Sequence, residues 1–259
     1  MFRRLILRVV AMLLASVFVL HASAAEVPNV AAASDLQFAL PEIAAAFQRD
    51  TGRTVRLTFG SSGNFRRQIA EGAPFEMFLS ADEAMVESLA KEGRAVDAGT
   101  RYATGRIVLF VPIGSPLALD PTFADLKLAL VDGRVQRFAI ANPEHAPYGR
   151  AAEQSLRSAG IWEAMVPRLV LGENVSQAAQ FATSGSAQGG IVAYSLALAP
   201  SLASKGASVL LPAGSHAPLQ QRMLLIKGAG ETARAFYAYL QQPPARAVFK
   251  RFGFTLPGE

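Results

Sequence analysis

Four predicted helices begin just after a predicted strand, and the residues at their starts have the chemistry of an anion site. These residues are Ser34, Ser61 with Ser62, Tyr148 and Val175. The first turn of a helix has backbone N–H groups without a partner, and the helix dipole adds partial positive charge there. In open α/β sheets the loops after the strands meet in one crevice. Each serine alone is typical of an ordinary N-cap, but the set together favours an oxyanion held without a formal cation.

Few residues are available for covalent or metal chemistry. The chain has no cysteine, which excludes disulfide scaffolds, zinc ribbons, thiol enzymes and iron–sulfur centres. Outside the first 25 residues only His145 and His216 remain, both in turn-like segments, and they are too few for a histidine-built metal site. The G-x-S-x-G nucleophile elbow of serine hydrolases is absent. The sequence therefore predicts a protein that is not an enzyme and carries no cofactor.

Two further motifs suggest phosphate chemistry, and both have simpler interpretations. Residues 228–233 match G-x-G-x-x-A between a predicted strand and a predicted helix. The dinucleotide fingerprint belongs to the first βα turn of its domain, with an acidic residue about 20 positions later. Too little chain follows here, so we interpret the motif as a glycine loop. Arg66 and Arg67 are interpreted as a solvated helix face; the alternative is a positive field beside an anion site.

Residues 1–25 have the three parts of a secretory signal peptide. A start with three arginines leads into an apolar run over 9–20, and small residues follow. This run is too short to cross a membrane core of about 30 Å comfortably. Cleavage after Ala24 or Ala25 removes three arginines and no acid, which lowers the net charge from +5 to +2. The sequence therefore predicts a periplasmic protein, expected to be a monomer, that does not bind nucleic acid.

Strands and helices alternate along the remaining chain. A strand, a loop and a helix recur three times between residues 27 and 93, which is typical of a mostly parallel sheet between helices. No repeat or linker divides the chain, so we expect one lobe built from both of its ends and a second from its middle. The expected boundaries are 26–104 and 223–259 for the first lobe and 105–222 for the second.

The sequence also predicts helix caps and a side-chain direction near the predicted helix starts. Ser34 with Gln37, and Asn174 with Gln177, have the spacing of helix N-terminal caps. Asp35 is expected to point outward as an acidic residue of a first helical turn.

A series of short segments resembles the periplasmic molybdate-binding proteins of ABC-type importers. The segments are A-A-A-S at 31–34, F-G-S-S-G at 59–63, R-Q-I-A-E-G-A-P at 67–74, L-S-A-D at 79–82, N-P-E-H-A-P-Y-G at 142–149, G-E-N-V at 172–175, G-I-V-A-Y-S at 190–195 and F-K-R-F-G-F at 249–254. Each is unspecific alone, but in this order they cover most of the chain after residue 25. The sequence departs from the family at Phe75 with Glu76, at Asn142 in place of aspartate, and at Tyr148, where alanine is frequent.

The resemblance implies a fold and a set of binding residues. The fold is the α/β, two-lobed periplasmic binding protein of type II, with a ligand cleft between lobes joined by two crossing strands. Ser34 and Ser62 would donate hydroxyl and backbone N–H groups, and Tyr148 and Val175 backbone N–H groups. Tyr194 would donate its phenol O–H, the alternative being a packed aromatic ring.

The resemblance also implies the ligand and its destination. A site with donors only suits molybdate or tungstate, which have no proton to donate, whereas phosphate requires an acceptor. The same residues would bind the oxygens of the ion, with no direct ligand to the metal atom. The implied partner is the membrane permease of an ABC importer. The alternatives are another tetrahedral oxyanion such as sulfate, or an enzyme on this fold.

Overall fold

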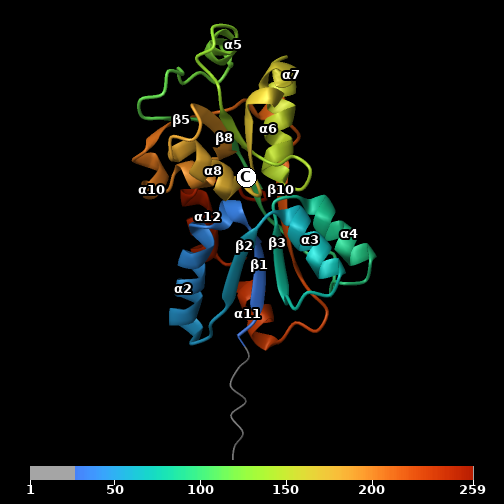
Figure 1. Cartoon of the computed structure of the whole chain (residues 1–259). Helices are drawn as coiled ribbons and strands as arrows, with labels where there is room; N and C mark the ends of the chain where they lie inside the picture. The colour runs from blue at the N-terminus through green and yellow to red at the C-terminus, as the bar shows by residue number, and fades with distance from the viewer. Residues whose placement is uncertain (1–26, 259) are drawn as a thin grey trace, which may run out of the picture.

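Two five-stranded sheets organise residues 27–258, the part of the chain that the computed structural model describes. Each sheet has helices on its faces, and Figure 1 shows the two resulting lobes one above the other. The predicted signal peptide lies outside the described residues. Among the described residues, no helix has the length and apolarity needed to cross a membrane.

The first sheet has the strand order β2-β1-β3-β10-β4. Its strands are β1 (Asn29–Ala33), β2 (Arg56–Gly60), β3 (Met77–Ser80), β4 (Thr100–Gly105) and β10 (Leu219–Leu225). The strands β1, β2 and β3 are parallel, and β10 runs antiparallel between β3 and β4. Because β1 lies between two strands and under helices on both faces, it is a continuous apolar run. Val30 and Ala32 pack into one core, and Ala31 packs into the other.

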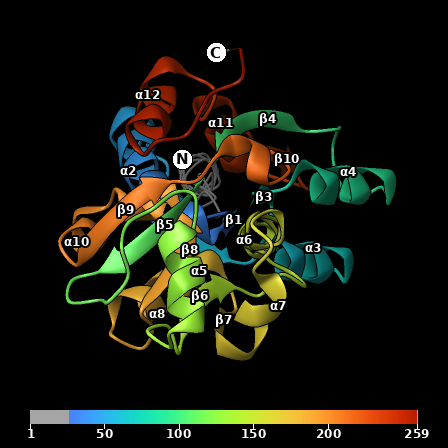
Figure 2. The same ribbon diagram turned by 90° about the horizontal axis from the view of Figure 1, so that it is seen from above.

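Helices cover both faces of the first sheet. On one face lie α2 (Ala39–Thr51), α11 (Glu231–Tyr239) and α12 (Pro243–Arg251); on the other lie α3 (Ser62–Ala70) and α4 (Glu83–Lys91). Figure 2 shows α2 with α12 on one side of this lobe and α3 with α4 on the opposite side. Phe47 and Phe236 join α2 to α11, with ring centroids 5.1 Å apart in an edge-on arrangement.

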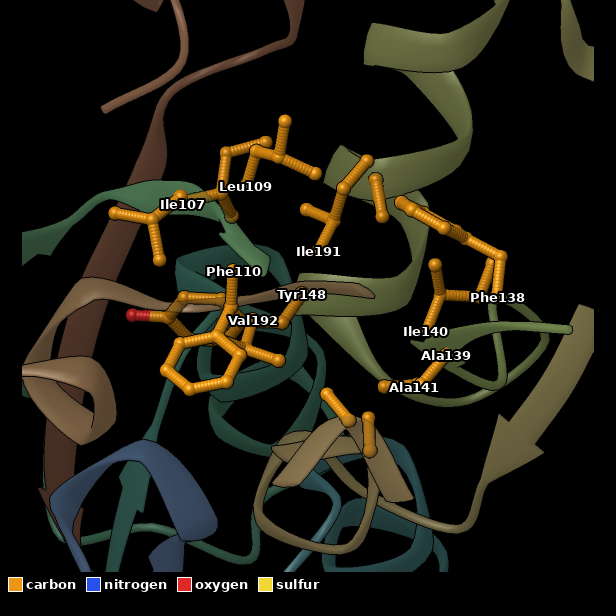
Figure 3. Packing of buried hydrophobic residues seen from close by; sticks show 14 of the residues in the cluster. Ile107, Leu109, Phe110, Phe138, Ala139, Ile140, Ala141, Tyr148, Ile191 and Val192 are labelled. Atoms are coloured by element: carbon orange, nitrogen blue, oxygen red, sulfur yellow. The ribbon is translucent and has the colours of Figure 1, made fainter. Parts of the chain in front are cut away.

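The second sheet has the order β7-β6-β8-β5-β9. Its strands are β5 (Ile107–Pro112), β6 (Phe138–Ala141), β7 (Leu169–Gly172), β8 (Gly189–Ala193) and β9 (Gly206–Leu210). The helical elements of this half are α5 (Ala124–Val131), α6 (Pro147–Ser158), α7 (Trp162–Met165), η2 (Val166–Arg168), α8 (Val175–Thr183), α9 (Tyr194–Ala197), α10 (Pro200–Ala203) and η3 (Ala213–Ser215). Figure 3 shows part of the core of this lobe, a single hydrophobic cluster that includes Phe110, Phe138, Ile191 and Tyr148.

The chain crosses between the lobes twice, as predicted. Arg106 alone separates β4 from β5, and residues 211–218 lead back from β9 to β10. The return differs from the predicted boundary, because residues 219–222 already pair with β4 in the first sheet. Gln220 and Gln221 hide the start of this strand in the sequence, since glutamine is not typical of a buried strand.

The residues after β1 do not form the capped helix that the sequence predicts. Ser34 begins a short 3-10 turn, η1 (Ser34–Leu36), and α2 begins only at Ala39. The Ser34 hydroxyl accepts from the backbone N–H of Ser176 (3.3 Å), and the Gln37 amide accepts from the Ser176 hydroxyl. The capping-box interpretation is therefore wrong, because both side chains turn towards the other lobe.

The second predicted cap is confirmed. The Asn174 side chain accepts from the backbone N–H of Gln177 (3.1 Å) at the start of α8. The Gln177 side chain in turn accepts from the backbone N–H of Glu173 (2.7 Å). These two bonds fix the loop that leads into α8.

The packing of the first lobe's core predicts how a cavity-forming substitution changes the free energy of unfolding. Phe236→Ala should lower the free energy of unfolding by about 3–5 kcal/mol, because it opens a cavity beside Phe47 in a core where Phe236 is fully buried. Leu128→Ala is the control, since Leu128 is 63% exposed and should change stability by less than about 0.5 kcal/mol. Urea denaturation measures both, and similar losses in the two variants would contradict this account of the core.

Candidate functional site

A small cavity of about 10 Å³ lies between the lobes, where strands of both sheets end. It is lined by Ala33, Ser34, Asp35, Gly60, Ser61, Ser62 and Ala81 from the first lobe and by Ala146, Pro147, Tyr148, Asn174 and Val175 from the second. Sites for drug-sized ligands measure roughly 300–1,000 Å³. The cavity therefore suits a small ion, and it is too small for a nucleotide or a sugar.

Three helix starts present backbone N–H groups to this cavity. Ser62 is the first residue of α3, Val175 is the first of α8, and Tyr148 follows Pro147 in the first turn of α6. Within the described chain these three N–H groups have no acceptor. Because each helix dipole adds partial positive charge at the same place, the cavity is set up to bind an anion. Neither lysine nor arginine is among its lining residues.

Two serine hydroxyls add donors from the first lobe. The Ser34 hydroxyl oxygen accepts from the N–H of Ser176 (3.3 Å), and the Ser62 hydroxyl oxygen accepts from the N–H of Ala81 (3.0 Å). A hydroxyl that accepts from an amide still has its own hydrogen to donate. Both side chains are buried at the cavity, so an anion is the natural acceptor for these hydrogens.

The lobes touch each other around the cavity. The carbonyl of His145 accepts from the N–H of Gly63 (3.0 Å), and the His145 Nδ1 lies 3.0 Å from the Ser61 hydroxyl. Arg150 of α6 forms an ion pair with Asp82, next to the start of α4. The sequence suggested a surface turn for His145, but its side chain is only 17% exposed, because this turn meets the start of α3. The structure is therefore a closed form of the two lobes.

Asp35 lines the cavity, and the sequence analysis did not predict this. Its outward orientation was expected, but the residue is 1% exposed. One carboxylate oxygen, Oδ2, accepts from the Tyr148 phenol (2.9 Å) and from the Gln221 side-chain amide (2.6 Å). The other oxygen, Oδ1, is buried without a hydrogen-bond partner. The expectation was wrong because a 3-10 turn replaces the predicted helix, and this turn directs Asp35 towards the second lobe.

The surroundings of Asp35 favour its neutral form. Burial raises the pKa of Asp35 to about 6, and the hydrogen bonds from Gln221, Tyr148 and its own backbone amide oppose this only in part. Burial, with the nearby Asp35 charge, also raises the pKa of Tyr148 and of Tyr102 well above the ordinary value. Both phenols are therefore neutral donors. Tyr102 donates to Gln221 Oε1 (2.6 Å), which directs the Gln221 Nε2 towards Asp35.

Of the predicted site residues, the structure brings Ser34, Ser62, Tyr148 and Val175 together and places Tyr194 elsewhere. The strand β8 ends at Ala193, and Tyr194 begins the short helix α9. Its ring lies 4.8 Å from the Arg106 guanidinium and packs against Gly253, outside the lining of the cavity. Its neighbour Ser195 instead reaches the site, donating from its hydroxyl to the Asp35 carbonyl (2.8 Å).

The two-lobed α/β fold with a small cavity between its lobes defines a class, the solute-binding proteins. The family model described as bacterial extracellular solute-binding protein matches residues 28–255, and this chain belongs to that family. It is 38% identical to the molybdate-binding protein ModA of Rhodobacter capsulatus, over 91% of this chain and 90% of the relative. It is 39% identical to ModA of Azotobacter vinelandii, over 96% and 97% of the two chains.

A solved structure agrees with these relatives. The periplasmic molybdate-binding protein of Azotobacter vinelandii superposes with a TM-score of 0.80 at 31% identity, covering 89% of this chain and 99% of that one. The sulfate-binding protein SubI of Mycobacterium tuberculosis has a TM-score of 0.70 at 17% identity, which is a likeness of fold alone. The expected two-lobed fold is confirmed, and the chain is a binding protein, as expected, and not an enzyme.

The contact between Gly63 and His145 predicts that a side chain at position 63 hinders closure of the two lobes. A Cβ atom on Gly63 would lie 2.5 Å from the His145 carbonyl oxygen, so Gly63→Ala cannot close without displacing backbone. We expect a cost of about 1–3 kcal/mol in ligand affinity, or about 5- to 150-fold. The unliganded variant should unfold at an unchanged temperature, because the clash forms only between closed lobes.

The control for this variant is Gly214→Ala, where an added Cβ meets no atom within 4 Å. Its affinity should equal that of the wild type in the same calorimetric titration. Full affinity in Gly63→Ala would mean that the ligand does not require the closed contact.

Proposed function

We propose that this protein captures molybdate, and tungstate with it, and delivers the ion to the membrane permease of an ABC transporter. The observation that carries the proposal is the donor set of the cavity, in which first-turn amides and serine hydroxyls from both lobes face one small space. The relatives named as molybdate-binding proteins support the choice of ion. We propose the periplasm as its location, a monomer as its state, and no cofactor.

Closure supplies both affinity and delivery in this proposal. Ser34 and Ser62 bind the oxygens of the ion from the first lobe, and Tyr148 and Val175 bind them from the second. An ion that contacts both lobes stabilises the closed form over the open one. Water is then excluded, and the fixed dipoles act on the dianion in a medium of low dielectric constant. Docking of the closed form on the permease and reopening of the lobes release the ion.

One observation favours a second candidate ligand. A charged carboxylate at Asp35 could accept a hydrogen bond from a protonated anion, and hydrogen phosphate is the common example. Oδ1 of Asp35 is the oxygen that such a ligand would use, because it has no partner in the chain. A site that offers only donors should prefer the dianion molybdate to hydrogen phosphate. A site in which Asp35 is a charged acceptor should prefer hydrogen phosphate to molybdate.

Calorimetric titration of the mature protein with four anions tests the proposal. We expect molybdate and tungstate to bind with similar affinity, because the two ions match in charge and nearly in size. Sulfate should bind more than about tenfold more weakly, since a smaller ion reaches fewer donors of a closed cavity at once. Phosphate should also bind weakly. Sulfate within tenfold of molybdate argues against the molybdate assignment, and a preference for phosphate selects the second candidate.

Removal of one hydroxyl from the cavity gives a second test. Ser62→Ala should weaken molybdate binding by about 1–3 kcal/mol, or about 5- to 150-fold, because a hydrogen bond to a charged acceptor is lost. It should also lower stability, because the buried N–H of Ala81 loses its acceptor. Tyr194→Phe is the matched control, since it deletes a hydroxyl outside the cavity and should leave affinity within about twofold. Equal affinities in the two variants would remove Ser62 from the binding site.

A further inference from the structure

Asp35 is an unusual residue for the wall of an anion site. Asp35 lines the cavity and is buried, and its Oδ2 already accepts from Tyr148 and Gln221, which leaves Oδ1 without a partner. A carboxylate there would face the ion with like charge in a medium of low dielectric constant. Burying a charge without a counter-ion is costly, and a group in this position usually changes its protonation state instead.

No cation compensates Asp35 within the described chain. The elements packed against η1 are α8, which has no titratable residue, α9, which has Tyr194, and β2, whose Arg56 bonds Asn29 at the far end of the strand. From β10, Arg222 pairs with Glu83.

The charged groups of β4 and α6, and the histidine beside the cavity, also have other partners. Arg101 of β4 pairs with Glu83, Arg150 of α6 pairs with Asp82, and Arg157 pairs with Glu153 and Glu163. His145 bonds Ser61 and Glu173. The side chains that hydrogen-bond the carboxyl group are thus the neutral ones of Tyr148 and Gln221.

We propose that Asp35 binds the oxyanion as a neutral carboxylic acid that donates its Oδ1 hydrogen to the ion, so that binding takes up one proton from solution. This inference rests on the proposed oxyanion function. The two donors on Oδ2 leave Oδ1, which has no hydrogen-bond partner, as the oxygen that carries the acidic hydrogen. The pKa of about 6 in the closed form, raised by burial, agrees with this assignment, and a dianion beside the group raises it further.

The neutral acid also determines which anions bind. A carboxylic acid donates through Oδ1–H, so the wall of the cavity consists of donors only when the ion is bound. An ion with a proton of its own then finds no acceptor at Oδ1, and its proton remains unsatisfied in a dry site. Asp35 is therefore a specificity residue for fully deprotonated tetrahedral anions.

Calorimetry with molybdate at pH 8 in two buffers of different ionisation enthalpy, such as HEPES and Tris, counts the protons taken up. We expect about one proton for the wild type at pH 8, and about a tenfold loss of affinity for each pH unit above 7. The measurements stay in the range where molybdate itself is fully deprotonated. Zero proton uptake at pH 8 overturns the inference, whatever the variants show.

Asp35→Asn supplies the donor permanently, since its amide can accept from Tyr148 and Gln221 and donate into the cavity. We expect this variant to take up no proton and to bind molybdate with the same affinity from pH 6 to pH 8. His145→Asn is the control, because the His145 side chain contacts Ser61 of the other lobe beside the cavity. It should keep the wild-type proton uptake and pH slope.

The outcomes separate this inference from the proposed function. Proton uptake that persists in Asp35→Asn, or that disappears in His145→Asn, assigns the proton to another group and overturns the inference. A wild type that binds phosphate more tightly than molybdate identifies Asp35 as a charged acceptor and also overturns it. If molybdate gives no heat at pH 6 or pH 8 but sulfate binds, the molybdate assignment fails, and the proton count with sulfate decides the role of Asp35.

Discussion

The structure depends on one electrostatic constraint: a small anion must be held in a dry cavity that no lysine or arginine lines. Backbone N–H groups at helix starts meet this constraint, because they are already unpaired and already point along the helix axis. One lobe offers too few of them to surround an ion. The fold therefore brings α3 of the first lobe to face α6 and α8 of the second. Parallel strands in both sheets place these helix starts at corresponding edges.

Asp35 adds a second, opposed electrostatic element to this cavity. Amides and hydroxyls have a fixed polarity, whereas a carboxyl group is a donor or an acceptor according to its proton. Its setting is built from both lobes, since Gln221 belongs to β10 and Tyr148 to α6. The register shift of β10 between Gln221 and Arg222 accompanies the turn of Gln221 into the interior, where it is fully buried. Closure therefore changes the environment of the carboxyl group as well as that of the ion.

The sequence allows the fold and most of the donor positions to be predicted, because both rest on local patterns. Alternating strands and helices predict parallel sheets, and helix starts after strands identify Ser62 and Val175. The remainder depends on contacts between distant segments. Ser34 and Gln37 have the spacing of a cap, yet they bond Ser176, which lies about 140 positions away. Only the turn geometry after β1 decides which way Asp35 faces.

Tyr194 shows a different limit of sequence patterns. Because β8 ends at Ala193, Tyr194 is the first residue of a helix, and its ring lies beside Arg106 and outside the cavity lining. The direction of this side chain therefore depends on where the strand gives way to the helix, which the apolar run in the sequence does not mark. Gly105 and Leu219 are paired in the ladder of β4 and β10, so both connecting segments leave the first lobe side by side. Two adjacent tethers permit essentially one rotation of one lobe against the other. In the open protein the serines and Asp35 stay at the edge of the first lobe, and the amides of Tyr148 and Val175 move away with the second lobe. An arriving ion thus exchanges part of its bound water for the donors of the first lobe. The donors of the second lobe replace the remaining water when the lobes close.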